Sequence, residues 1–212
     1  MAIFERAFAG RELHDPPWFR RVFSDTRMAP LWTVARVYLG YQWLLAGWHK
    51  LWGEDRWVNV PGPDGLGLRG FWERAIAIPQ EGRPPIVYDW YRDFVQYMVN
   101  HEWYTWFAWV IALGEVLAGI GLIVGAFTGL AALGGALMNF NFMLAGTAST
   151  NPVLFVIAIL ILFGWKVAGW IGVDRWLLPA LGTPWEPGGV VRPVAEKLGR
   201  GVTGLQPHAK PT

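Results

Sequence analysis

Cysteine is absent from this chain of 212 residues, and charged residues make up only 16% of it. The absence of cysteine excludes a disulfide scaffold, a thiol-dependent enzyme and an iron–sulfur protein. A soluble domain carries roughly 25% charged residues, so this chain has too few charges to cover a surface that faces water. Its content of 53% hydrophobic residues also excludes a disordered chain. The composition therefore predicts a membrane protein.

The sequence also lacks the motifs of several enzyme classes. It has no Walker loop for phosphate, no GxGxxG segment that opens a helix after a strand, and no CxxC pair. It shows no Ser/His/Asp arrangement and no basic face for nucleic acid. The net charge of +2 is better explained by contact between cytoplasmic basic residues and anionic lipid. Membrane lipid is thus an expected partner, and nucleic acid is not.

Aromatic residues are abundant instead, with 15 Trp, 12 Phe and 6 Tyr. Trp and Tyr rings favour the headgroup level of a bilayer. Four apolar segments are long enough to cross its hydrocarbon, which takes about 20 residues. We therefore predict an all-α fold, an integral membrane four-helix bundle with spans at about 31–52, 103–125, 128–146 and 152–173. The last three spans have short connections and should be antiparallel neighbours.

The remaining segments complete the predicted organisation. Residues 1–29 form a cytoplasmic N-terminal segment with an amphipathic piece at 17–23, residues 30–175 form the four-span domain, and residues 176–212 form a cytoplasmic Pro/Gly-rich tail. Residues 53–101 form an amphipathic extracytoplasmic loop. Five Arg among the first 29 residues and five Lys or Arg after residue 173 place both termini in the cytoplasm of a multi-pass protein of the cell membrane.

Ionisable residues at bilayer depth cost roughly 2.5–3.5 kcal/mol each near a helix centre, so each one suggests a function. On the first span, Arg36, Gly40, Trp43, Gly47 and Lys50 recur at helical spacing and share one face. This face carries a cation near each end, with glycines between the two cations.

Depth counting along the spans predicts that Arg36, Glu115, Asn139 and Lys166 meet in the interior of the bundle. A structural ion pair is the simpler interpretation, because buried charges must pair for solvation alone. The functional interpretation gives Glu115 a proton-carrying or headgroup-binding role. Arg36, Lys50, Trp43, Asn139 and Lys166 would then bind the ligand.

Two histidines lie near the predicted outer boundary, His49 at the end of the first span and His101 at the start of the second. Two histidines on neighbouring helices can ligate a b-type haem. We favour solvated, interfacial histidines, so haem is not expected, and the sequence indicates no metal site. A histidine beside a carboxylate and aromatic rings also suits a quinone headgroup, with His101 or Glu115 handling protons and His49 close to the ring.

Four segments resemble the DoxX/DoxD family of membrane proteins: RVYLGYQWLLAGWHKLW, LGEVLAGIGLIVGAFTGLAA, MNFNFMLAGTASTNPVLF and WKVAGWIGVDRWLLP. The resemblance covers roughly residues 30–187 and implies a four-helix transmembrane bundle with polar positions at Arg36, Lys50, Glu115 and Asp174. One branch is the DoxD subunit of thiosulfate:quinone oxidoreductase, which works with a second subunit, DoxA. The resemblance thus implies a quinone-linked oxidoreductase of the respiratory chain, with quinone as cofactor and an additional protein subunit.

The sequence does not decide whether the chain is itself an enzyme. It fits a membrane subunit that passes electrons to membrane quinone, with thiosulfate as one conceivable donor. It also fits a non-catalytic partner or scaffold of a larger respiratory assembly, with the aromatic outer loop as its docking surface. A transporter ranks last, because no inverted repeat or broken helix is evident in the sequence.

Overall fold

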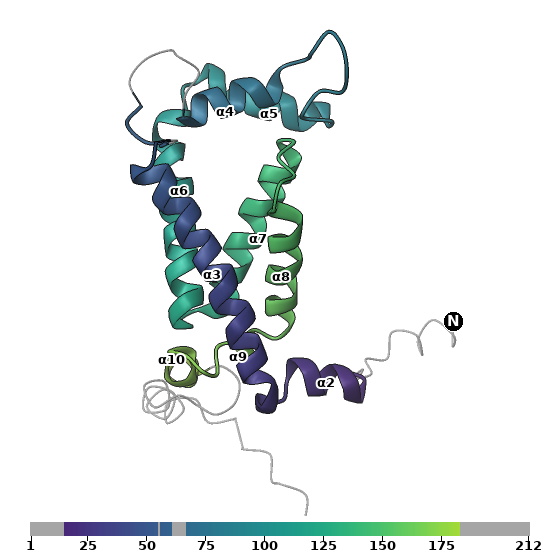
Figure 1. Ribbon diagram of the computed structural model, residues 1–212, viewed down its shortest axis with the longest axis vertical. Coiled ribbons are helices and arrows are strands. Elements are labelled where there is room, and N and C mark those ends of the chain that lie inside the picture. The colour runs from purple at the N-terminus through teal and green to yellow at the C-terminus, as the bar shows by residue number, and fades with distance from the viewer. Residues whose placement is uncertain (1–14, 55, 61–66, 183–212) are drawn as a thin grey trace, which may run out of the picture.

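The structure is a computed structural model that describes residues 15–54, 56–60 and 67–182. This part of the chain is all-helical, which confirms the predicted class. Helices α3 (Ala29–Trp52), α6 (Tyr104–Val124), α7 (Thr128–Leu144) and α8 (Asn151–Phe163) form its long body (Figure 1). α3 packs on α6, α6 on α7, α7 on α8 and α8 on α3. The contacts between these helices therefore close into a ring.

Short helices cover the two ends of this ring (Figure 1). α4 (Gly67–Ile76) and α5 (Asp89–Asn100) lie across one end, and α2 (Pro17–Phe23), α9 (Trp165–Ala168) and α10 (Asp174–Ala180) lie at the other. α2 coincides with the amphipathic piece predicted at 17–23. Residues 1–14 and 183–212, and with them most of the predicted tail, lie outside the described residues.

The helix predicted over residues 152–173 is divided in the structure. α8 ends at Phe163, and the chain turns at Gly164 before the single turn of α9. A Cβ atom at Gly164 would lie 3.3 Å from Phe23 Cδ1 and from Trp32 Cε2, so the lack of a side chain lets this turn pack under α2 and α3. An apolar run continues past residue 163, and the hydropathy pattern therefore does not show the turn.

The surface of the long helices is apolar. α6 is long and apolar enough to cross a membrane, with a mean hydropathy of 2.2 over its most apolar stretch. α7 and α8 are apolar but shorter, at 17 and 13 residues. Large apolar side chains such as Leu117, Leu130 and Val156 are exposed on these helices. Such a surface suits lipid contact better than water.

α3 and α6 pack at very close range through small residues. A Cβ atom at Gly40 would lie 2.8 Å from the carbonyl oxygen of Gly119, and one at Gly47 would lie 2.8 Å from that of Ala112. These two contacts show that the helices are antiparallel and fix their register. Small residues at a helix interface allow this approach of the two backbones.

The buried apolar residues form two clusters. One contains Trp32, Trp43, Leu122 and Ala136, and the other contains Leu51, Trp72, Val95 and Ala112 under α4 and α5. Along α3, α6 and α7, the first cluster lies toward α2, α9 and α10 and the second lies toward α4 and α5. The candidate site lies at the boundary between the two clusters.

Replacing Gly119 with alanine should destabilise the protein by about 1–3 kcal/mol, the usual cost of overpacking. The new methyl group would come within 2.5 Å of the Leu44 amide nitrogen, and a backbone must move to make room. Gly114→Ala on the same helix is the matched control, because its nearest neighbour is Met138 Sδ at 3.5 Å. Thermal unfolding in detergent compares the two variants, and equal stabilities would contradict the packing described.

Candidate functional site

A buried ion pair joins α3 to α6. Lys50 Nζ lies 2.8 Å from both Glu115 carboxylate oxygens. The Glu115 side chain is 0% exposed and the Lys50 side chain 15% exposed. Helical side chains lean toward the N-terminus of their own helix, so in an antiparallel pair Lys50 and Glu115 lean toward each other. The Lys50 ammonium thus neutralises the Glu115 carboxylate where no water reaches it.

This pairing differs from the predicted cluster of Arg36, Glu115, Lys166 and Asn139, which was wrong in its cations. The register of α3 on α6 puts Arg36 level with Ile123, eight residues from Glu115, or about 12 Å along the helix. Lys166 lies on α9, where its ammonium is 5.6 Å from the Trp165 ring centroid. The cation that reaches Glu115 is therefore Lys50.

The ion pair borders a cavity of about 210 Å³ between α3, α6, α7 and α8. Three buried polar atoms of its lining have no hydrogen-bond partner: Trp43 Nε1 and the Nδ2 and Oδ1 atoms of Asn139. Asn139 is completely buried. An unsatisfied buried polar group costs about 1–3 kcal/mol. The residues around the cavity therefore include hydrogen-bond donors and an acceptor that have no partner within the described part of the chain.

Gly135 makes room for the indole of Trp43 beside this cavity. A Cβ atom at Gly135 would lie 2.8 Å from Trp43 Nε1. Asn139 follows Gly135 by one helical turn on α7, so the indole and the amide share one wall of the site. The volume lies below the roughly 300–1,000 Å³ of ordinary ligand sites, which suits a single small headgroup.

An aromatic wall covers the Lys50 side of the cavity. Lys50 Nζ lies 4.8 Å from the Trp57 ring centroid and 5.3 Å from that of Phe142. The Trp57 ring stacks on Phe71 of α4 at 5.2 Å. Sequence reasoning assigned no role to Trp57, Phe71 or Phe142. Trp57 and Phe71 belong to the segment that connects the first two spans, and its pattern does not show over which helix end it folds.

Arg36 has a different setting at the opposite end of the ring. Its guanidinium donates hydrogen bonds to the carbonyl oxygens of Leu122, Ile123 and Ile171. It thereby satisfies carbonyls at the C-terminal end of α6, which have no partner within the helix. Arg36 thus connects α3, α6 and the segment after α9, and it does not line the cavity beside Glu115.

Asp174 completes this second polar cluster. Its carboxylate accepts hydrogen bonds from the amides of Phe127, which precedes α7, at 2.7 Å and of Thr128, the first residue of α7, at 2.8 Å. Phe127 has a left-handed backbone with φ of 49°, and the Asp174 carboxylate holds it there. Asp174, one of the four polar positions that the family resemblance implies, therefore caps the start of α7.

His49 and His101 both lie on the surface, outside the cavity lining. The His101 ring lies against Tyr97, with centroids 4.0 Å apart, and its Nδ1 atom is 2.8 Å from the Tyr97 carbonyl oxygen. The structure thus brings together Trp43, Lys50, Glu115 and Asn139 of the predicted site residues. It separates Arg36, Lys166, His49 and His101 from them.

An all-helical fold with an apolar outer surface indicates a membrane protein, and a buried ion pair in it borders a small polar cavity. The DoxX family model matches residues 31–148, more than half of the chain, and the chain belongs to the DoxX family. This match includes Lys50, Glu115, Trp43 and Asn139 but ends before Asp174. No curated protein and no solved structure matches the chain significantly.

Removing the Lys50 charge alone should destabilise the protein. Lys50→Met leaves the buried Glu115 carboxylate without its counter-ion, which typically costs about 3–5 kcal/mol. The double variant Lys50→Met/Glu115→Gln removes both charges and should recover a large part of this loss. Thermal unfolding of the two variants measures the difference, and a double variant no more stable than Lys50→Met would contradict the pairing.

Proposed function

We propose that this DoxX-family chain is a membrane subunit of a quinone-linked oxidoreductase and that the polar cavity holds the quinone headgroup. The observation that carries the proposal is the unpartnered Trp43 Nε1 and Asn139 amide in a cavity beside a buried carboxylate. A quinone ring is flat and apolar with a carbonyl oxygen at each end. It therefore needs a small aromatic cavity with hydrogen-bond donors, and this cavity has both.

Each residue of the cavity has a distinct role in this proposal. Trp43 Nε1 and Asn139 Nδ2 donate hydrogen bonds to carbonyl oxygens. Glu115 takes up and releases protons, and Lys50 holds its carboxylate in place at 2.8 Å. A bound quinone supplies the capacity to accept two electrons and two protons. Trp57, Phe71 and Phe142 form the aromatic wall on the Lys50 side.

The electrons must come from outside this chain, because it has no cysteine for sulfur chemistry. An additional protein subunit that oxidises the donor fits this need, and thiosulfate is the donor that the family resemblance favours. The outward face of α5 provides an aromatic surface for such a subunit through Trp90 and Tyr97, which are both exposed. A chain that copurifies with partners but binds no quinone would instead be a non-catalytic member of the assembly.

Binding of quinone should depend on the Trp43 indole. Trp43→Phe removes a donor that has no partner among the described residues, so the affinity for decylubiquinone should fall about tenfold, the equivalent of one hydrogen bond. Trp32→Phe is the matched control on the same helix, because Trp32 Nε1 already donates to the Val22 carbonyl at 2.8 Å. Chromatographic measurement of quinone bound to the purified protein gives both affinities.

Two results would refute the proposed site. Wild-type protein that retains no quinone on purification and binds no decylubiquinone contradicts the function. Equal affinities of wild type and Trp43→Phe contradict the placement of the headgroup. Glu115→Gln supplies a further measurement, since loss of quinone reduction with retained binding would support its role as proton carrier.

In this proposal α3, α6 and α7 cross the cell membrane, and α8 crosses it together with α9. Both termini are then in the cytoplasm, and α4 and α5 are outside. The absence of cysteine makes this testable, because a single introduced thiol is the only one to react. Asp93→Cys on α5 should react with a membrane-impermeant maleimide in intact cells. Ser24→Cys, after α2, should react only once the membrane is opened. The reverse pattern would contradict this orientation.

A further inference from the structure

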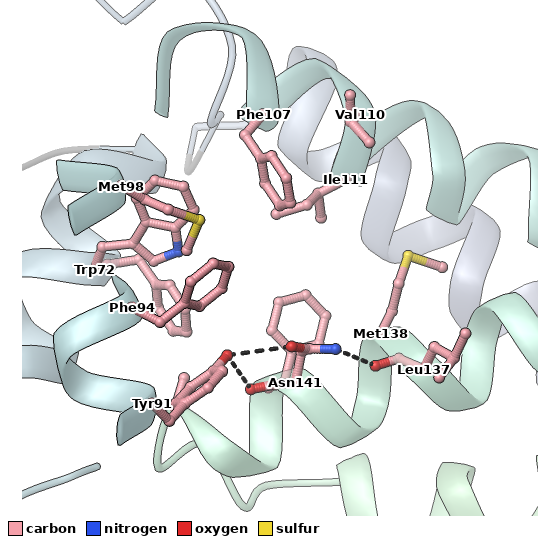
Figure 2. Close-up of a pocket in the computed structure, with 13 residues that line it drawn as sticks. Trp72, Tyr91, Phe94, Met98, Phe107, Val110, Ile111, Leu137, Met138 and Asn141 are labelled. Atoms are coloured by element: carbon pink, nitrogen blue, oxygen red, sulfur yellow. Dashed lines mark hydrogen bonds between the residues drawn. The ribbon is translucent and has the colours of Figure 1, made fainter. Parts of the chain in front are cut away.

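We propose that a second cavity, beside the first, holds the hydrocarbon chain of the ligand and opens sideways through the gap between α6 and α7. This inference rests on the proposed function. It assigns a binding place to the hydrocarbon chain of the quinone, for which the polar cavity has no room. The second cavity also has a volume of about 210 Å³. It lies where α4 and α5 meet α6 and α7 (Figure 2).

The lining of this second cavity is apolar. Trp72, Phe94, Met98, Phe107 and Ile111 point into it from α4, α5 and α6 (Figure 2). Such a lining offers dispersion contacts and little hydrogen bonding, which is what a hydrocarbon chain requires.

Polar groups at its edge are already satisfied. The Tyr91 hydroxyl lies 3.3 Å from both Oδ1 and the carbonyl oxygen of Asn141, and Asn141 Nδ2 donates to the Leu137 carbonyl at 2.8 Å (Figure 2). Burial raises the pKa of Tyr91, so this hydroxyl stays neutral. The contrast with the unpartnered Trp43 and Asn139 atoms assigns the headgroup to the polar cavity and the chain to the apolar one.

The two cavities have a common wall. Phe71 and Phe142 line both of them, with ring centroids 6.2 Å apart and planes at 83°. Aromatic side chains therefore form the shared boundary. One amphiphilic molecule that occupies both spaces would pass between these two rings.

The apolar cavity also reaches the outer surface of the helices. Val110 of α6 is 53% exposed and Leu137 of α7 is 54% exposed, and both line the cavity. The surface around them is apolar, with Leu113 and Leu133 exposed nearby on the same two helices. A chain dissolved in lipid can thus enter between α6 and α7 without crossing water.

Blocking this opening should affect only ligands with a chain. Val110→Trp places a large ring at the mouth and should weaken binding of decylubiquinone at least tenfold, whereas binding of the same headgroup without a side chain should not change. Leu113→Trp is the matched control, since Leu113 is exposed on the same helix but does not line the cavity. Leu137→Trp repeats the test from α7. The readout is quinone bound to immobilised protein, quantified by chromatography.

The outcomes separate this inference from the proposed function. Undiminished binding of decylubiquinone by Val110→Trp and Leu137→Trp would overturn the chain cavity while the headgroup site stands. Equal weakening of both ligands would also overturn it, because the variants would then act on the headgroup. Binding of neither ligand by wild type would refute the proposed function itself. Mass spectrometry of the lipids that copurify with the protein identifies the molecule that supplies the chain. If wild type copurifies with a phospholipid but no quinone, and Val110→Trp lacks that phospholipid, the assignment to quinone is overturned.

Discussion

The close packing of α3 against α6 is the constraint on which both polar sites depend. Gly40 against Gly119 and Gly47 against Ala112 set the register of the two helices. That register brings Lys50 to Glu115 and carries Arg36 past them to the C-terminal carbonyls of α6. A larger residue at any of these glycines would separate the helices, and both polar clusters would lose their geometry together.

The two polar clusters, Arg36 with Asp174 and Lys50 with Glu115, satisfy buried polar groups in different ways. Arg36 and Asp174 satisfy backbone groups at the ends of α6 and α7, so their charges stabilise the turn between the helices. Lys50 and Glu115 satisfy each other and leave the neighbouring Trp43 and Asn139 without partners. Buried polar atoms without hydrogen bonds lower the stability of the fold. A bound molecule that forms those hydrogen bonds would recover the lost free energy. Buried atoms without a partner also occur at the Arg36 cluster, at Arg36 Nε and Thr128 Oγ1, but those of Trp43 and Asn139 belong to residues that line a cavity. This is the reason to place function beside the Lys50–Glu115 pair.

Several features of the site follow from the sequence pattern. The face of Arg36, Gly40, Trp43, Gly47 and Lys50 is one face of α3 and is directed inward. The importance of Glu115 and Asn139 also follows from it, because polar residues within apolar helices must be buried against partners. The choice of partner does not follow. Counting residues from helix ends gives the depth of a side chain only to within one or two helical turns. An error of this size is enough to place Arg36 and Lys166 beside Glu115, although they contact other groups in the structure.

The sequence by itself determined the helical class, the apolar surface and which polar residues face inward, because these depend on periodicity and composition within each helix. Only the tertiary structure decided that Lys50 pairs with Glu115, that Arg36 and Asp174 cap helices, and that Trp57 and Phe71 lie over the ion pair. Those contacts depend on the register between helices and on the path of the segment between α3 and α5. Both are set by the packing of residues far apart in the chain, which no local pattern encodes.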